Sequence, residues 1–158
     1  MSETTVKRMP KAGETASLTL TITDEMVRRF AELSGDSNPV HLDDAYAAKT
    51  RFKRRIAHGM LVSSMFSRLA GMHLPGPGTI IVSQETRYKA PCYIGDTVTA
   101  QLKIVNVRED KPIIKIENSI HNQNGDLLIE GEAILFYDPI GLEPCLLASE
   151  TERRLNSC

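Results

Sequence analysis

The chain has 158 residues, a length that fits one domain and leaves little room for two. Hydrophobic residues make up 41% and charged residues 25%, an ordinary globular composition that argues against a disordered, collagenous or coiled-coil chain. The 19 Lys and Arg are balanced by 20 Asp and Glu, so the net charge is −1 and no nucleic-acid partner is expected.

The cysteines and the hydropathy pattern indicate the compartment. Cys92, Cys145 and Cys158 are odd in number and form no CxxC pair, so neither a disulfide framework nor a cysteine metal site is expected. No apolar run approaches the roughly 18 residues that a membrane span needs. The N-terminus also lacks the apolar region of a signal peptide. We therefore expect a soluble, cytoplasmic protein with no membrane partner.

The first patterned stretch predicts a strand followed directly by a helix. Apolar residues alternate with Thr and Ser over residues 15–23, which indicates a half-buried strand. Thr23 suits the N-cap of a helix over residues 24–33, because its hydroxyl can accept a hydrogen bond from the first turn. The apolar stripe of this helix is expected at Met26, Val27, Phe30 and Leu33.

An irregular segment follows and leads into a second helix. The GDSNP turn begins at Gly35, and Asp43 suits the cap of a short helix over residues 44–49. The polar run TRFKRR is expected to be a loop. The stretch from His58 to Pro75 reads as a helix that is apolar on most sides, which is typical of a buried helix.

Four long strands are predicted after this helix, over residues 79–89, 97–107, 112–122 and 127–137. NQNGD and VREDKP provide the hairpin turns between the last three. The order of elements predicts an α+β domain with its helices on one face of an antiparallel sheet. The domain is expected over residues 15–138, between an N-terminal segment over 1–14 and a surface tail over 139–158.

Asp36 and His41 are the first candidates for chemistry. They lie five residues apart around Asn38-Pro39, so a turn can bring both side chains to one pocket. A carboxylate and an imidazole can hold a water between an acceptor and a donor, which suits general acid–base catalysis. The alternative is that Asp36 stabilises the turn and His41 is a hydrogen-bonded, partly buried histidine.

The start of the second helix offers a site for a ligand oxygen. The first turn of a helix carries free N–H groups, and Gly59 lets a ligand approach the backbone closely. A carbonyl oxygen there would have developing negative charge stabilised, as in an oxyanion hole. Gly59 could equally be a flexible helix entry, and the residue before it, His58, is interpreted as a packing residue.

Ser63, Ser67 and Ala70 follow on the same helix at spacings of four and seven residues, so they share a face. This face could line a narrow slot in which Ser67 touches a polar ligand, or the serines could bond to carbonyls of the preceding turn. The basic run Lys53, Arg54 and Arg55 is expected to be a solvated loop, with contact to the phosphates of an anionic cofactor as the alternative.

These motifs together resemble one family. GDSNPVHLDDAYA, the later HGM and the stretch PGPGTIIVSQETRYKAPCYIGDTV resemble the MaoC-like (R)-specific enoyl-CoA hydratases over roughly residues 15–137. The resemblance implies a single hot-dog domain, in which a curved antiparallel sheet wraps a central helix, and a homodimer. It also implies reversible syn addition of water to a trans-2-enoyl-CoA, with no metal or redox cofactor, since coenzyme A is part of the substrate.

The resemblance assigns roles to four residues. Asp36 and His41 match the catalytic pair, Gly59 matches the glycine whose N–H polarises the thioester carbonyl, and Ser67 matches a serine that arranges the site. Ala70 is small, which predicts room for acyl chains beyond four carbons. Arg55 stands where the family pattern has Pro, so the loop before His58 is expected to differ. A carrier-protein dehydratase, a hot-dog thioesterase and a non-catalytic hot-dog scaffold subunit are the alternatives.

Overall fold

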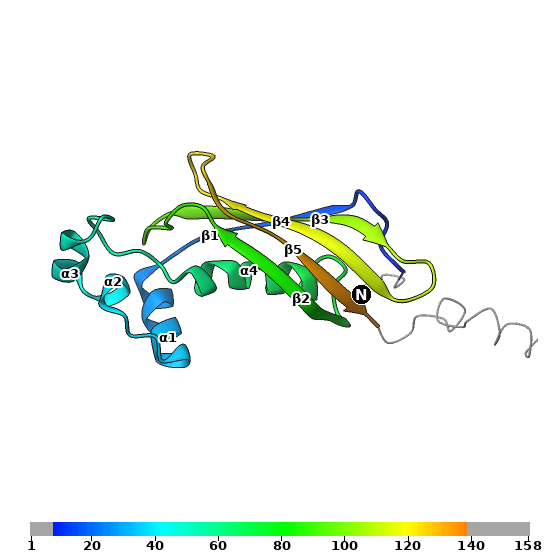
Figure 1. Ribbon diagram of the computed structural model, residues 1–158, viewed down its shortest axis with the longest axis horizontal. Coiled ribbons are helices and arrows are strands. Elements are labelled where there is room, and N and C mark those ends of the chain that lie inside the picture. Colours follow the sequence, from blue (N-terminus) through cyan, green and yellow to red (C-terminus); the bar gives the residue numbers. More distant parts are fainter. Residues whose placement is uncertain (1–7, 139–158) are drawn as a thin grey trace, which may run out of the picture.

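The computed structural model describes residues 8–138, which form one five-stranded antiparallel sheet with a helix lying along one face (Figure 1). The sheet order is β1-β3-β4-β5-β2. Its strands are β1 (Thr15–Thr21), β2 (Thr79–Tyr88), β3 (Thr97–Val107), β4 (Ile113–His121) and β5 (Leu127–Tyr137). The predicted α+β class is confirmed, and each predicted strand lies within two residues of the observed bounds.

The helices divide into two groups. Helix α4 (Gly59–Met72) lies against the sheet, whereas α1 (Asp24–Ser34), α2 (Pro39–Leu42) and α3 (Asp44–Lys49) gather at the end of the molecule where α4 begins (Figure 1). Both predicted caps are confirmed. The Thr23 hydroxyl accepts from Met26 N at 3.2 Å, and the Asp43 carboxylate accepts from Tyr46 N at 2.9 Å.

The core lies between α4 and the face of the sheet that it covers. Alternate residues of β3 and β4 point to this face and are buried, because side chains of a strand alternate between its two faces. Burial of apolar area contributes about 25 cal/mol per Å², so this layer is the main stabilising element of the domain. Its largest fully buried apolar side chains include Phe66, Leu69, Leu102, Ile104, Ile114, Ile116 and Ile120.

Two predicted apolar faces differ from the structure. Leu33 is 87% exposed, and α1 buries Val27 and Ala31 instead, because the helix touches the core only along that edge. Helix α4 was expected to be buried on most sides, but its apolar residues Met60 and Met72 are 66% and 67% exposed. The sheet covers only one side of α4, so its opposite side remains open in the single chain.

The ends of the chain are described only in part. Within residues 8–138, no helix has the length and apolar character needed to cross a membrane. The tail predicted over residues 139–158, with Cys145 and Cys158, lies outside the described residues, as do the first seven residues of the predicted N-terminal segment.

Candidate active site

A hydrogen-bonded turn places Asp36 directly after α1. The helix ends at Gly35, whose φ of 77° is a left-handed conformation that favours glycine. The Asp36 carboxylate accepts from Asn38 N at 3.2 Å, and the Asn38 side chain then caps α2 by accepting from Val40 N at 3.2 Å. The side chain of Asp36 thus performs the turn-stabilising role considered above, and the turn also brings His41 towards it.

His41 is buried, and its hydrogen bond defines its tautomer. The side chain lies on α2 and is 8% exposed, and its Nδ1 is 2.8 Å from the carbonyl oxygen of Ile56. A carbonyl oxygen can only accept, so Nδ1 carries the proton and Nε2 has a free lone pair. Burial lowers the pKa of His41, against the opposing effect of the Ile56 hydrogen bond. His41 is therefore held neutral, the form in which it can accept a proton.

His58 lies beside both predicted catalytic residues. It is 2% exposed, its ring centroid is 3.9 Å from that of His41, and its Nε2 is 2.9 Å from the backbone oxygen of Asp36. The side chains of Asp36, His41 and His58 each place a polar atom within 4.8 Å of the other two. The interpretation of His58 as a packing residue from the sequence missed these contacts. The one signal in the sequence was the position of His58 directly before Gly59.

These three side chains are also the set that a metal ion would use. The His41 and His58 rings are tilted by 32° with their centroids 3.9 Å apart. One nitrogen of each ring already faces a backbone oxygen, that of Ile56 for His41 and that of Asp36 for His58. These contacts leave Nε2 of His41 available for proton transfer.

Gly59 and His41 both line an apolar cavity of about 460 Å³. Gly59 is the first residue of α4, and a Cβ at this position would lie 2.6 Å from the Tyr88 ring, so the glycine is required by the packing of that ring. Burial raises the pKa of Cys92, which also lines the cavity, to about 12, so its thiol is neutral. The cavity therefore offers a mainly apolar space next to His41 and to the free N–H groups at the start of α4.

The serines of α4 are placed differently from each other. Ser63 is 6% exposed, and its hydroxyl contacts Met60 O at 3.2 Å and the Tyr88 hydroxyl at 3.3 Å. Ala70 is 1% exposed, whereas Ser67 is exposed. The expected shared inward face is therefore wrong for Ser67 in the described chain, because residues four apart on an α-helix are offset by about 40° and Ser67 falls beyond the edge of the sheet contact.

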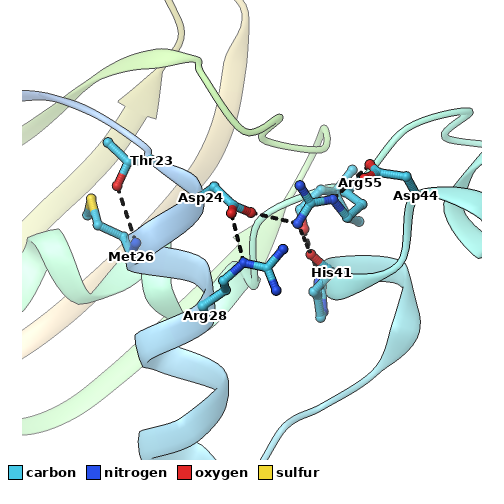
Figure 2. Close-up of polar contacts among 8 residues, drawn as sticks. Thr23, Asp24, Met26, Arg28, His41, Asp44 and Arg55 are labelled. Atoms are coloured by element: carbon cyan, nitrogen blue, oxygen red, sulfur yellow. Dashed lines mark hydrogen bonds and ion pairs between the residues drawn. The ribbon is translucent and has the colours of Figure 1, made fainter.

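Arg55 joins three parts of the site segment (Figure 2). Its side chain is 13% exposed and pairs with Asp24 of α1 at 2.6 Å and with Asp44 of α3 at 2.8 Å. The same guanidinium lies 3.4 Å from the backbone oxygen of His41. The prediction of a solvated loop is thus wrong for Arg55, and its charge is committed to these carboxylates instead of to a phosphate. Arg54 lies over the Tyr93 ring at 3.8 Å.

A larger hollow of about 710 Å³ lies elsewhere, on the sheet face that α4 does not cover. Its lining is mostly polar and includes Arg87, Lys103, Glu117 and Glu130. It contains none of Asp36, His41, His58 or Gly59. We therefore assign the site to the smaller cavity, where a buried imidazole and an apolar wall occur together.

Comparison with known proteins places the chain in a family. A family model described as a MaoC like domain matches residues 5–124. The chain belongs to the MaoC-like family. It is 45% identical over 125 residues to a protein of Aeromonas caviae named (R)-specific enoyl-CoA hydratase, covering 79% of this chain and 93% of that protein. It is also 38% identical over 130 residues to a mitochondrial 3-hydroxyacyl-[acyl-carrier-protein] dehydratase of Arabidopsis thaliana, covering 80% and 77%.

Solved structures of related proteins have the same fold as this chain. The (R)-hydratase from A. caviae, described as involved in PHA biosynthesis, superposes with a TM-score of 0.80 at 43% identity, covering 82% of this chain and 98% of that one. The predicted hot-dog architecture is confirmed by this likeness. The family match includes Asp36, His41 and Gly59 and ends before β5, which completes the sheet between β4 and β2.

Proposed function

We propose that this MaoC-like protein is an (R)-specific enoyl-CoA hydratase, which adds water reversibly to a trans-2-enoyl-CoA to give an (R)-3-hydroxyacyl-CoA. The observation that carries this proposal is that Asp36 lies next to His41, which lines the same cavity as Gly59. The two relatives reported above are named for hydration of an enoyl thioester of coenzyme A and for dehydration of a 3-hydroxyacyl thioester of acyl carrier protein. Both are hydro-lyases, so the reaction class does not depend on the direction.

The chemistry follows from the charges that the reaction develops. Attack of water on Cβ places negative charge on the thioester oxygen, and the N–H of Gly59 at the positive end of α4 would stabilise that charge. Asp36 and His41 would hold the water, take one of its protons and return a proton to Cα. Addition to one side of the double bond requires both groups to face the substrate from the same side.

No further cofactor is required by this scheme. The proton transfers need only groups that can accept and donate near neutral pH, and the oxyanion needs only hydrogen-bond donors. The thioester itself activates the double bond, so coenzyme A is part of the substrate. We also propose that the enzyme is cytoplasmic and acts in fatty acid metabolism.

Acyl chain length is proposed to depend on α4. Ser63 and Ala70 are buried against the sheet, and Ala70 leaves more space than a larger apolar residue would. We expect the chain to accept acyl groups beyond four carbons and Ser67 to arrange the site. Replacing Ala70→Leu should lower activity on octenoyl-CoA much more than on crotonyl-CoA, and unchanged medium-chain activity would disprove this part of the proposal.

A homodimer is proposed on the exposed apolar edge of the sheet. β2 is an edge strand, and its Ile80 and Val82 are each 60% exposed, while Met60 and Met72 are exposed on the open side of α4. An apolar edge strand with free backbone groups is a template for pairing with another chain. Light scattering should give twice the chain mass, and Val82→Lys should shift the protein towards the monomer.

The test of function follows the enoyl-thioester absorbance. Purified protein with crotonyl-CoA and octenoyl-CoA should consume the double bond, and chiral analysis should identify the (R)-alcohol. Free thiol release without hydration would indicate a thioesterase instead. The 38% identical carrier-protein dehydratase makes an enoyl group on acyl carrier protein the second substrate to assay. No turnover of either carrier would indicate the non-catalytic scaffold.

A further inference from the structure

The environment of His58 connects every part of the proposed site. Its imidazole lies tilted against His41 of α2 with ring centroids 3.9 Å apart, and its Nε2 lies 2.9 Å from the backbone oxygen of Asp36. Phe30 of α1 also contacts this ring at 5.0 Å between centroids. The next residue along the chain is Gly59, so one buried side chain touches the aspartate, the histidine and the start of α4.

The hydrogen bond of His58 requires one tautomer. The Asp36 backbone oxygen can only accept, so Nε2 of His58 must carry the proton. Its Nδ1 is buried and has no hydrogen-bond partner among residues 8–138. The side chain is 2% exposed, and its ring lies tilted against the His41 ring. The hydrogen bond to the Asp36 backbone therefore fixes the orientation of the His58 ring.

His58 does not line the cavity beside His41 and Gly59, so it would not itself exchange protons with substrate. Its N–H holds the backbone of Asp36, and its ring supports one face of His41, whose own Nδ1 is held by Ile56. These contacts leave the Asp36 carboxylate and His41 Nε2 as the groups free to act. A displacement of about 1 Å in such a pair can lower the rate about 100-fold.

We propose that His58 is a positioning residue, which fixes Asp36 by its hydrogen bond and His41 by the contact between their rings, so that both reach the same water. This inference rests on the proposed hydratase function. It gives His58 a role that the sequence interpretation did not assign, although it does not make His58 a catalytic residue. The two contacts can be separated, because one uses a donor atom and the other uses a ring.

Three substitutions separate the contacts. His58→Gln keeps an N–H donor at similar reach and loses the ring, His58→Phe keeps a ring and loses the donor, and His58→Leu loses both. We expect kcat to fall about 10-fold in His58→Gln and His58→Phe and about 100-fold in His58→Leu, with KM changed less than about 3-fold. The matched control is His73→Gln at the far end of α4, which should keep the parent kcat.

The measurements distinguish failure of the inference from failure of the function. All kinetics are measured well below each variant's melting temperature and are divided by the folded fraction from circular dichroism. A parent protein that hydrates no enoyl thioester disproves the proposed function. A parent that hydrates crotonyl-CoA while His58→Leu keeps more than half of its kcat per folded molecule disproves the inference alone. Equal losses in all three variants, or losses only in KM, would also overturn it.

Discussion

The sheet with α4 and the segment over residues 24–58 are held together by different forces. Neighbouring strands of the sheet share long antiparallel registers, and their inward residues form one apolar layer. The site segment instead depends on side chains that bond to backbone groups and on Arg55 with its two carboxylates. Burial of apolar area stabilises without direction, whereas these polar contacts fix positions. The comparison predicts that substitutions in the site segment mainly lower activity, whereas substitutions in the sheet mainly lower the free energy of unfolding.

The largest effect is expected from the catalytic pair, on activity alone. Asp36→Asn keeps the shape of its side chain, His41→Gln keeps an N–H donor but loses the ring, and both substitutions remove the ability to exchange a proton at the reacting carbons. We expect each to lower kcat by about 100- to 10,000-fold for hydration of crotonyl-CoA. The melting temperature should change little for Asp36→Asn, because the amide oxygen can still accept from Asn38 N. The control is Asp43→Asn, which keeps a cap on α3 and should retain activity.

The opposite result is expected in the sheet. Ile116 is 1% exposed on β4, between Ile104 of β3 and Ala133 of β5. Ile116→Ala removes buried methyl groups and leaves a cavity, which should lower the free energy of unfolding by about 2–5 kcal/mol. Its neighbour Glu117 is exposed, so Glu117→Ala should change that free energy by less than about 0.5 kcal/mol. Urea unfolding measures both, and a fall in kcat per folded molecule of Ile116→Ala would contradict the division between the regions.

An intermediate effect on both properties is expected at Arg55. Its partner carboxylates are 43% and 82% exposed, so the ion pairs are screened and Arg55→Met should lower the free energy of unfolding by on the order of 1 kcal/mol. Because Arg55 also reaches the backbone of His41, we expect kcat to fall several-fold.

The matched control for Arg55 is Arg28→Met, which removes the other arginine on Asp24 from an exposed side of α1. It should change neither kcat nor stability measurably. Raising the ionic strength should lower the stability of the parent protein more than that of Arg55→Met, which has already lost these two ion pairs. Equal losses in the two arginine variants would show that Arg55 contributes only general charge balance.

The same comparison explains what the sequence could predict. Strands such as 97–107 were located because alternation is a local signal that repeats along one element. The Thr23 and Asp43 caps are local as well. Asp36 and His41 were found because they lie in one short turn motif. The contacts of His58 with Asp36 and of Arg55 with Asp24 join residues 22 and 31 positions apart, and no periodicity encodes such pairs.

Burial was harder to predict than secondary structure. Ser63 and Ser67 have the same chemistry and neighbouring positions on α4, yet one is buried and the other exposed. The edge of the helix–sheet contact decides between them, and this edge depends on how far the sheet curves around α4. The exposure of Leu33 has the same origin. Patterning identifies a helix, whereas the width of its buried stripe is a tertiary property.

The smallest effect is expected from the titration of His41 in the site segment. Burial lowers the pKa of His41 below its ordinary value of 6.5, the nearby His58 imidazole lowers it further, and the Ile56 carbonyl and Asp36 carboxylate oppose the shift. The unfolded chain therefore binds a proton more readily than the folded one. This contribution to stability is fully present above about pH 6.5 and is lost as the pH falls from there through the lowered folded pKa.

We expect the melting temperature of the parent protein to decrease over this interval more than that of His41→Gln, which cannot titrate there. Identical pH dependence of the two proteins would show that burial does not hold His41 neutral. It would also remove the reason for expecting His41 to act as the proton acceptor at neutral pH.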